Sequence, residues 1–274
     1  MVDHTSFIGM IFSLVLSILG PLGVLIWFRM KYQASLLSFF VGAAAFFIAV
    51  QCLEGPLNVY LLSLNETTAT FLKQSPFIFA IYGGLMAGLF EETARLISFK
   101  VCLKKQTRIQ DGLAYGIGHG GIEAILFAGM ASVNNLIIGF LINQQRLDTL
   151  QLPPDIANLV TTQLVETPPA LFFVSGIERL LTLVIHMALS LLVFNAVKYR
   201  RYGYYGLAIF LHMMLNIPAA FYQLGYLNIW LVEGYVLLFS IGSILYIIKS
   251  LKAHQSELRQ VEDEELTYVK AQRY

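Results

Sequence analysis

Long apolar segments alternate with short polar connections along the chain. Seven segments each hold about 20 or more mostly apolar residues, the length that an α-helix needs to cross the hydrocarbon core of a bilayer. The pattern therefore predicts an all-α transmembrane helix bundle with seven spans. The spans are predicted at Phe7–Phe28, Ala34–Leu53, Pro76–Leu103, Gly112–Ile142, Ala170–Val197, Gly203–Leu224 and Leu227–Ile248.

Composition supports a membrane protein. Hydrophobic residues make up 57% of the 274 residues and charged residues only 13%, whereas soluble domains carry about 25% charged residues. The start, MVDHTS, lacks the basic segment of a signal peptide, so we expect the first apolar segment to be retained as a span. The lipid bilayer is the expected partner, and no nucleic-acid partner is expected.

Basic residues predict the orientation of the bundle. Fourteen of the 18 Lys and Arg residues fall on one side of the predicted spans, and only Lys73 and Arg146 fall in the connections on the other side. Because Lys and Arg accumulate in cytoplasmic loops, the N-terminus is predicted outside and the C-terminus inside. No internal repeat divides the chain, so we expect one membrane domain, residues 1–252, and a cytosolic tail, residues 253–274.

Two polar stretches are expected to form helices outside the membrane. The outer connection 143–169 is rich in proline and has room for a short helix around Asp155–Val165. The tail contains the acidic run Glu262-Asp263-Glu264-Glu265 and is expected to be a solvated helix.

Ionisable side chains are concentrated in four consecutive spans, the third to the sixth. Such residues are costly inside a membrane and usually functional. The third span carries Glu91, Glu92 and Arg95; the fourth, His119 and Glu123; the fifth, Glu178, Arg179 and His186; and the sixth, His212 together with Asn216.

The depth of these side chains indicates a single site. Glu91, His119, Glu123, His186 and His212 each lie nine to fifteen residues from a basic residue on the inner side, which is about 14–22 Å along a helix. The four helices run alternately up and down, so similar distances place the side chains in one layer. Scattered structural residues would not be expected to align in this way.

Local spacing agrees with a shared site. His119 and Glu123 are four residues apart and lie on one face of a helix, and His212 and Asn216 have the same relation. Four glycines surround His119 and are expected to let neighbouring helices approach closely and to offer a place for substrate to enter. They are Gly116, Gly118, Gly120 and Gly121.

The chemistry that fits these side chains is metal-assisted hydrolysis. Neutral imidazoles and a carboxylate suit Zn²⁺, which makes bound water a nucleophile at neutral pH. Glu91 and Glu92 point about 100° apart on a helix, so one is expected to handle water and the other to pair with an arginine. A structural reading also exists, in which Glu91, Glu92 and Arg95 form only an ion-pair network. The Glu178–Arg179 pair is expected to be structural.

These motifs resemble the YhfC family of intramembrane metalloproteases. The resemblance covers a four-helix core, residues 76–218, and rests on short motifs in a specific order. They are Glu91-Glu92-x-x-Arg95, Gly116-x-Gly118-His119-Gly120-Gly121-x-Glu123, Glu178-Arg179 with His186, and His212-x-x-x-Asn216. The wider group includes the CAAX prenyl endopeptidases, the PrsW proteases and the anterior-pharynx-defective scaffold subunit of gamma-secretase.

The resemblance implies roles for individual residues. Glu91 and Glu92 match the paired glutamates that activate water, and Arg95 stands one residue earlier than its counterpart in the prenyl endopeptidases. His212 and Asn216 match the last motif of the group. His186 matches the histidine of the intervening helix, Glu123 takes the place of the second motif's His or Glu, and His119 stands where Phe is usual.

The sequence thus predicts an intramembrane endopeptidase, with a membrane protein or peptide as substrate, in the bacterial cell membrane. Glu91 is the expected general base with Glu92 and Arg95 in support, and Asn216 is expected to stabilise the oxyanion. His119, Glu123, His186 and His212 are the candidate ligands of a divalent metal, Zn²⁺ by its chemistry. Two alternatives stay open. They are a non-catalytic scaffold subunit, and a proton-coupled transporter, against which the lack of an internal repeat argues.

Overall fold

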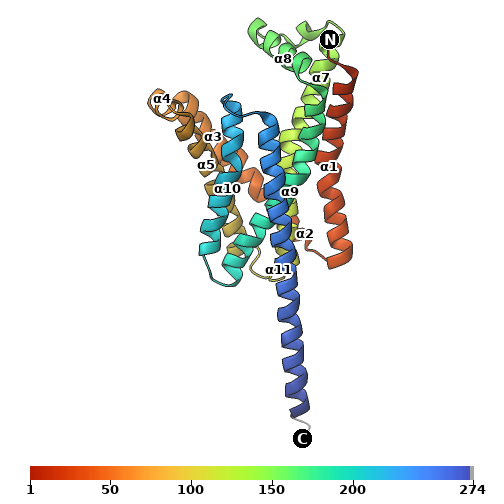
Figure 1. Ribbon diagram of the computed structural model, residues 1–274, viewed down its shortest axis with the longest axis vertical. Coiled ribbons are helices and arrows are strands. Elements are labelled where there is room, and N and C mark those ends of the chain that lie inside the picture. The colour runs from red at the N-terminus through yellow and green to blue at the C-terminus, as the bar shows by residue number, and fades with distance from the viewer. Residues whose placement is uncertain (272–274) are drawn as a thin grey trace.

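The computed structural model describes the backbone of residues 1–271 and the side chains of residues 1–256. Seven helical segments are long and apolar enough to cross a membrane, and they run roughly along the long axis of the molecule (Figure 1). The predicted all-α bundle of seven spans is therefore confirmed. The spans are α1 (His4–Tyr32), α2 with η1, α3 and η2 (Leu36–Leu64), α5 with η3 (Pro76–Cys102), α6 with η4 and α7 (Ile109–Asn143), α9 (Pro169–Lys198), α10 (Gly203–Gln223) and the part Ile229–Ser256 of α11 (Ile229–Ala271).

Local sequence fixes where the spans begin. Asp3 caps α1 by accepting a hydrogen bond from a backbone N–H of the first turn (2.7 Å), and Ser35 caps α2 in the same way (3.2 Å). Proline opens α5 and α9, at Pro76 and Pro169, because the first helical residue needs no N–H donor. Between these starts the backbone groups bond within each helix, as a bilayer requires.

The second span is longer than the sequence suggests. Its helix continues through α2 (Leu36–Phe46), the π-helical turns η1 (Phe47–Glu54), α3 (Gly55–Val59) and the π-helical η2 (Tyr60–Leu64), whereas the apolar run predicts an end at Leu53. The wider π-helical turns of η1 come immediately before Pro56, a residue that would otherwise interrupt the helix. Glu54, expected in a connection, is consequently held inside a helix.

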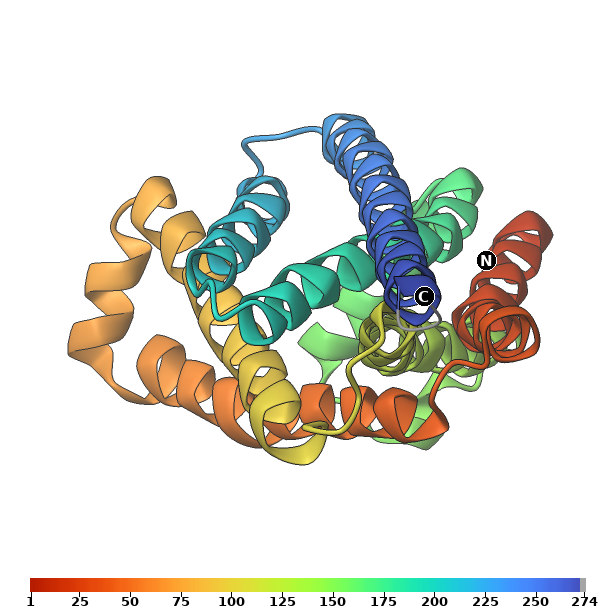
Figure 2. The same ribbon diagram turned by 90° about the horizontal axis from the view of Figure 1, so that it is seen from below.

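Helix α9 forms the centre of the bundle, as the view along the helices shows (Figure 2). In its most apolar stretch 72% of the residues are buried, against 22–28% in the other six spans. It packs against α1, α6 (Ile109–Ala124), α10 and α11, while α10 also packs against α5 (Pro76–Ile97) and α6 against α2. Side chains that point inward from α5, α6 and α10 therefore meet those of α9.

The glycines of α6 allow this close packing. A Cβ on Gly116 would lie 2.5 Å from the Cα of Met187 in α9, and a Cβ on Gly118 would clash with the carbonyl group of Phe39 in α2. The helices thus touch backbone to backbone, which is the close approach expected from small residues in membranes. These faces are filled by neighbouring helices, so they leave no open surface for the substrate entry expected there.

The remaining elements lie between or beyond the spans. Helix α8 (Pro154–Glu166) confirms the short helix expected around Asp155–Val165, and α4 (Glu66–Lys73) follows the second span. Helices η3 (Ser98–Cys102), η4 (Ile125–Gly129), α7 (Met130–Asn143) and η5 (Leu147–Leu150) complete the order. Helix α11 continues through most of the predicted tail and extends well beyond the other helices (Figure 1). The acidic run at 262–265 lies outside the residues whose side chains are described, and the predicted orientation stays a prediction.

Replacing Gly118 tests the packing of α6 on α2. We expect Gly118→Ala to lower the thermal unfolding temperature in detergent by several degrees, because overpacking costs about 1–3 kcal/mol. Gly206→Ala is the matched control, since a Cβ there meets nothing within 4 Å. Intrinsic fluorescence of both variants during heating gives the comparison. Equal unfolding temperatures would contradict the close contact.

Candidate metal centre

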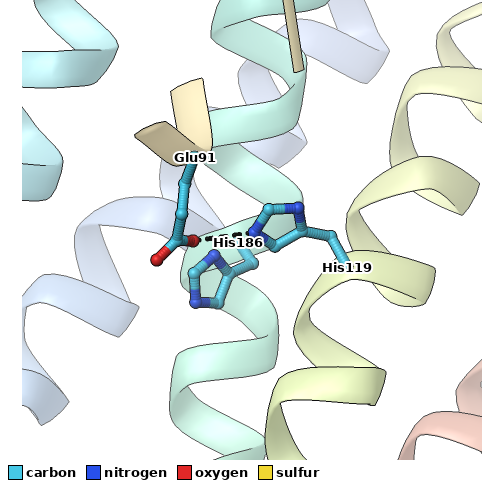
Figure 3. Close-up of side chains that lie close together, drawn as sticks. All are labelled: Glu91, His119 and His186. Carbon is cyan, nitrogen blue, oxygen red and sulfur yellow. Dashed lines mark hydrogen bonds and ion pairs between the residues drawn. The ribbon is translucent and has the colours of Figure 1, made fainter. Parts of the chain in front are cut away.

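Three buried side chains from three helices converge in the interior of the bundle. Glu91 of α5, His119 of α6 and His186 of α9 each offer one donor atom, and these atoms all lie within 4.8 Å of one another. Figure 3 shows the carboxylate and the two rings pointing toward a common point. The exposed fractions are 6%, 0% and 3%, so the group is shielded from the surroundings.

His119 is fixed by its neighbours on both sides. Its Nε2 lies 2.8 Å from Oε2 of Glu91, and the edge of the Phe46 ring packs against the imidazole with ring centroids 4.9 Å apart. Its Nδ1 is buried and has no hydrogen-bond partner in the part of the chain whose side chains are described. A buried ring nitrogen without a partner is costly, and a ligand or water would satisfy it.

His212 of α10 is oriented by a carboxylate. Its Nδ1 lies 2.7 Å from Oε1 of Glu92, which accepts the hydrogen bond. The Nδ1 therefore carries a proton, and Nε2 of the same ring lies 3.7 Å from Oε1 of Glu91. In metal sites, the ring nitrogen of a histidine that does not bind the metal usually donates a hydrogen bond to a carboxylate or to another acceptor.

Arg95 links two halves of the cluster. Its fully buried guanidinium forms an ion pair with Glu92, and its Nη2 lies 2.6 Å from Nδ1 of His186. A guanidinium only donates hydrogen bonds, so Nδ1 of His186 accepts, and Nε2 carries the proton that it shares with Glu123. Arg95 lies farther from Glu91, at 3.9 Å, so Glu92 is the glutamate that pairs with the arginine.

Glu123 is held by a second arginine. Nη1 of Arg179 donates to its Oε1 at 3.1 Å, and Nη2 of the same guanidinium pairs with Glu178. The expected Glu178–Arg179 pair is thus present, and it also ties α9 to α6 through Glu123. Glu92 and Glu123 are each neutralised by an arginine, whereas Glu91 has no arginine within hydrogen-bond distance among the described side chains.

A cavity of about 410 Å³ opens onto this cluster. Asn216, which was expected at the site, lies in its wall, and its Nδ2 donates a weak hydrogen bond of 3.4 Å to the main-chain oxygen of His212. The structure therefore brings Glu91, Glu123, His186, His212 and Asn216 together around one space, whereas the predicted residues Glu92, Arg95 and His119 do not line it. The polar residues of the wall are Glu54, Glu91, Glu123, Glu178, Arg179, Thr182, His186, His212, Asn216 and Gln223.

Glu54 in this wall is a residue that the sequence reasoning missed. It is 8% exposed, and Nδ2 of Asn58 donates to it at 3.3 Å. The hydroxyl of Tyr82 in turn donates to Oδ1 of Asn58 at 2.5 Å. The predicted span ended one residue before Glu54. The spacing of Glu54 and Asn58, four residues apart directly after an apolar run, is the signal that could have found it.

The comparisons with known proteins agree with these motifs. The family model described as YhfC intramembrane metalloprotease matches residues 15–236. A protein of Bacillus subtilis (strain 168) described as uncharacterized membrane protein YhfC is 38% identical over 259 residues, which cover 93% of this chain and all of that relative. The chain belongs to the YhfC family. No solved structure matches it.

Membership in the YhfC family confirms the resemblance expected from the motifs. The matched part contains every residue of the cluster, from Glu91 to His212. The chain is an integral membrane protein with seven apolar helices, and its bacterial relative agrees with a location in the bacterial cell membrane. The description of the family also implies a metal ion.

The residues present fit such an ion. Two imidazoles and a carboxylate are donors that Zn²⁺ prefers, and one donor atom from each of the three lies within 4.8 Å of the other two. One condition follows from the hydrogen bonds. Because Arg95 now occupies the lone pair on Nδ1 of His186, an ion bound at that nitrogen requires the guanidinium to withdraw.

Removing Arg95 tests the charge balance of the cluster. We expect Arg95→Met to lower the free energy of unfolding by about 3–5 kcal/mol, because Glu92 would be left as an unpaired buried charge. In the double variant with Glu92→Gln much of this loss should be recovered. Denaturant unfolding of Arg95→Met, Glu92→Gln and the double variant in the same detergent measures the difference. A double variant that is as unstable as the sum of the two single variants would contradict the pairing.

Proposed function

We propose that the protein is a metal-dependent intramembrane endopeptidase that hydrolyses a peptide bond of a membrane protein or membrane-associated peptide. The observation that carries this proposal is the environment of the Glu91 carboxylate. This carboxylate faces two imidazoles and the cavity, and it is the acidic group of the cluster that no arginine neutralises at hydrogen-bond distance. It is therefore the carboxylate best able to accept a proton.

The metal would be held where the donor atoms lie closest together, by Oε2 of Glu91, by His119 and by His186. Bound zinc supplies Lewis acidity that makes water a nucleophile at neutral pH and polarises a carbonyl group. His212 is the next candidate ligand, since its Nε2 lies 3.7 Å from Oε1 of Glu91. Glu123 is less free to bind, because it already pairs with Arg179 and His186.

The chain's own residues account for the proton transfers. Oε1 of Glu91 faces His212 and accepts a proton from water as the water oxygen bonds to the peptide carbon. The same oxygen then returns this proton to the nitrogen of the leaving peptide as the C–N bond breaks. Asn216 in the cavity wall has an amide that can donate to the oxyanion formed between these steps.

The other charged residues position this machinery. Glu92 fixes the ring of His212, and Arg95 fixes Glu92 and the ring of His186 at the same time. Arg179 holds Glu123, which holds the opposite side of His186. Imidazoles locked by such contacts lose little entropy when a ligand or substrate arrives.

Metal content tests the first half of the proposal. Protein purified in mild detergent and supplied with zinc is expected to retain about one ion per chain, as a tetrahedral protein site would. The double variant His119→Ala/His186→Ala should lose most of it. His4→Ala is the matched control because His4 is exposed and lies outside the cluster. Elemental analysis of variants with matched unfolding temperatures gives the result, and equal metal in all three would refute the assigned ligands.

Cleavage tests the second half. We expect cells that express the wild-type protein to contain new peptide N-termini near membrane segments of other proteins. Glu91→Gln should reduce their abundance by about 100-fold or more, because general base catalysis contributes about that much. Glu66→Gln, at an exposed carboxylate on α4, is the control. Quantitative mass spectrometry of labelled N-termini measures the effect. Bound metal without any cleavage that depends on Glu91 would instead favour the scaffold function.

A further inference from the structure

A second polar cavity lies at one end of the bundle, away from the metal cluster. It measures about 360 Å³ and is formed by η3, the connection that follows it, the end of α9 and the turn into α10. Four of its lining residues are cationic, and no carboxylate lines it. The cations are Lys100, Lys104, Lys198 and Arg200.

Among the described side chains, no carboxylate balances the positive charge of this pocket. None of the four cations forms an ion pair with a described side chain, although Arg108 in the same connection pairs with Asp111 at 3.0 Å. The ammonium group of Lys100 instead lies 4.4 Å from the centre of the Tyr202 ring. The ammonium group of Lys198 similarly lies 5.1 Å from the centre of the Tyr199 ring. A cavity lined by four cations without a carboxylate partner among the described side chains is suited to an anion with several acceptor oxygens.

Arg200 occupies its place against local preference. Its φ of 54° is in the left-handed region, which glycine or asparagine adopts more easily than arginine. The turn between α9 and α10 would therefore form more readily with another residue. The side chain at this strained position is also one of the four cations that line the pocket.

The floor of the pocket is apolar. Phe99 and Phe194 pack edge to face with ring centroids 5.5 Å apart, and each is 3% exposed. Leu103, 2% exposed, and Val197 complete this side. A small inorganic anion would contact only the cations of the pocket. A ligand with a charged head and methylene groups would contact the cations and the apolar floor as well.

The position along the spans indicates which ligand this is. The pocket lies where the spans Pro76–Cys102 and Pro169–Lys198 end, and so at the depth of lipid headgroups. Basic pockets between helices at this depth bind anionic headgroups. We propose that the pocket binds the phosphate group of an anionic phospholipid, with the lipid's methylene groups on the Phe99–Phe194 floor. This proposal is independent of the proposed peptidase activity.

The experiment compares two variants that each lose four positive charges. The pocket variant carries Lys100→Gln, Lys104→Gln, Lys198→Gln and Arg200→Gln. The control variant carries Lys31→Gln, Lys105→Gln, Lys249→Gln and Lys252→Gln, at exposed lysines that do not line the pocket. Exposed lysines attract anionic lipids through their charge even where there is no pocket. The control variant therefore shows how much of the lost binding comes from the loss of charge alone and how much comes from the pocket.

Delipidated full-length protein in detergent is titrated with dioleoylphosphatidylglycerol or dioleoylphosphatidylcholine, and bound lipid is counted by native mass spectrometry. We expect the wild type to prefer phosphatidylglycerol, the pocket variant to bind it at least about tenfold more weakly, and the control to stay within about twofold of the wild type. Equal weakening in both variants, or a wild type without preference, would overturn the proposal.

A competition arm separates a lipid from a soluble phosphate. Inorganic phosphate and glycerol phosphate carry the same acceptor oxygens and lack the methylene groups. Failure of either to displace the lipid at equal concentration supports the proposal, and displacement by them would overturn the lipid assignment. If the pocket variant does not fold, the exposed single variants Lys104→Gln and Arg200→Gln replace it, each with an expected loss of about two- to fivefold.

Discussion

The charge of Arg95 has to be neutralised inside the bundle, and the arrangement of the site follows from that requirement. A guanidinium stays ionised under all ordinary conditions, and Arg95 is fully buried. Glu92 supplies the opposite charge, which commits that carboxylate and makes it the acceptor for His212. The second edge of the guanidinium contacts His186 and thereby sets which ring nitrogen of this histidine carries a proton. Glu91, the adjacent residue in the sequence, is left facing His119 and the cavity, because neighbouring side chains on a helix point about 100° apart.

Close packing of helices makes this network achievable. Glycines on α6 bring its backbone against α9 and α2, so short side chains such as those of His119 and His186 reach each other across the interface, with ring centroids 5.1 Å apart. Larger residues would separate the helices and break the short hydrogen bonds on which the buried charges depend. The π-helical turns act in the same region of the fold, since η1 ends at Glu54 and η4 begins two residues after Glu123. Such turns often occur at functional sites, where they redirect side chains.

Much of this could be predicted from the sequence, and the rest could not for identifiable reasons. The length of the apolar segments predicted all seven spans. The similar distances of Glu91, His119 and His186 from basic residues at the ends of the spans placed these side chains in one layer. The ion-pair partner of Arg95 was harder to predict, because its guanidinium can reach Glu91 or Glu92 from nearly the same backbone position. In the structure Arg95 packs against His186 and pairs with Glu92. Glu54 was missed for a different reason. An acidic residue followed by Gly55 and Pro56 is typical of the end of a helix, and the π-helical turns that carry the helix onward have no sequence signature of their own.

The metal cluster and the basic pocket are joined by a continuous series of rings. Phe194 contacts Phe99, Phe99 contacts Tyr115 with centroids 4.7 Å apart, and Tyr115 lies 6.0 Å from His119. Spatial continuity of this kind does not by itself establish energetic coupling between sites. A substitution of Phe99 or Phe194 is therefore a less specific test of the pocket, because both rings belong to the series that ends at His119. None of the four cations of the pocket belongs to this series of rings, so replacing them tests the pocket without altering a ring that leads to the histidines.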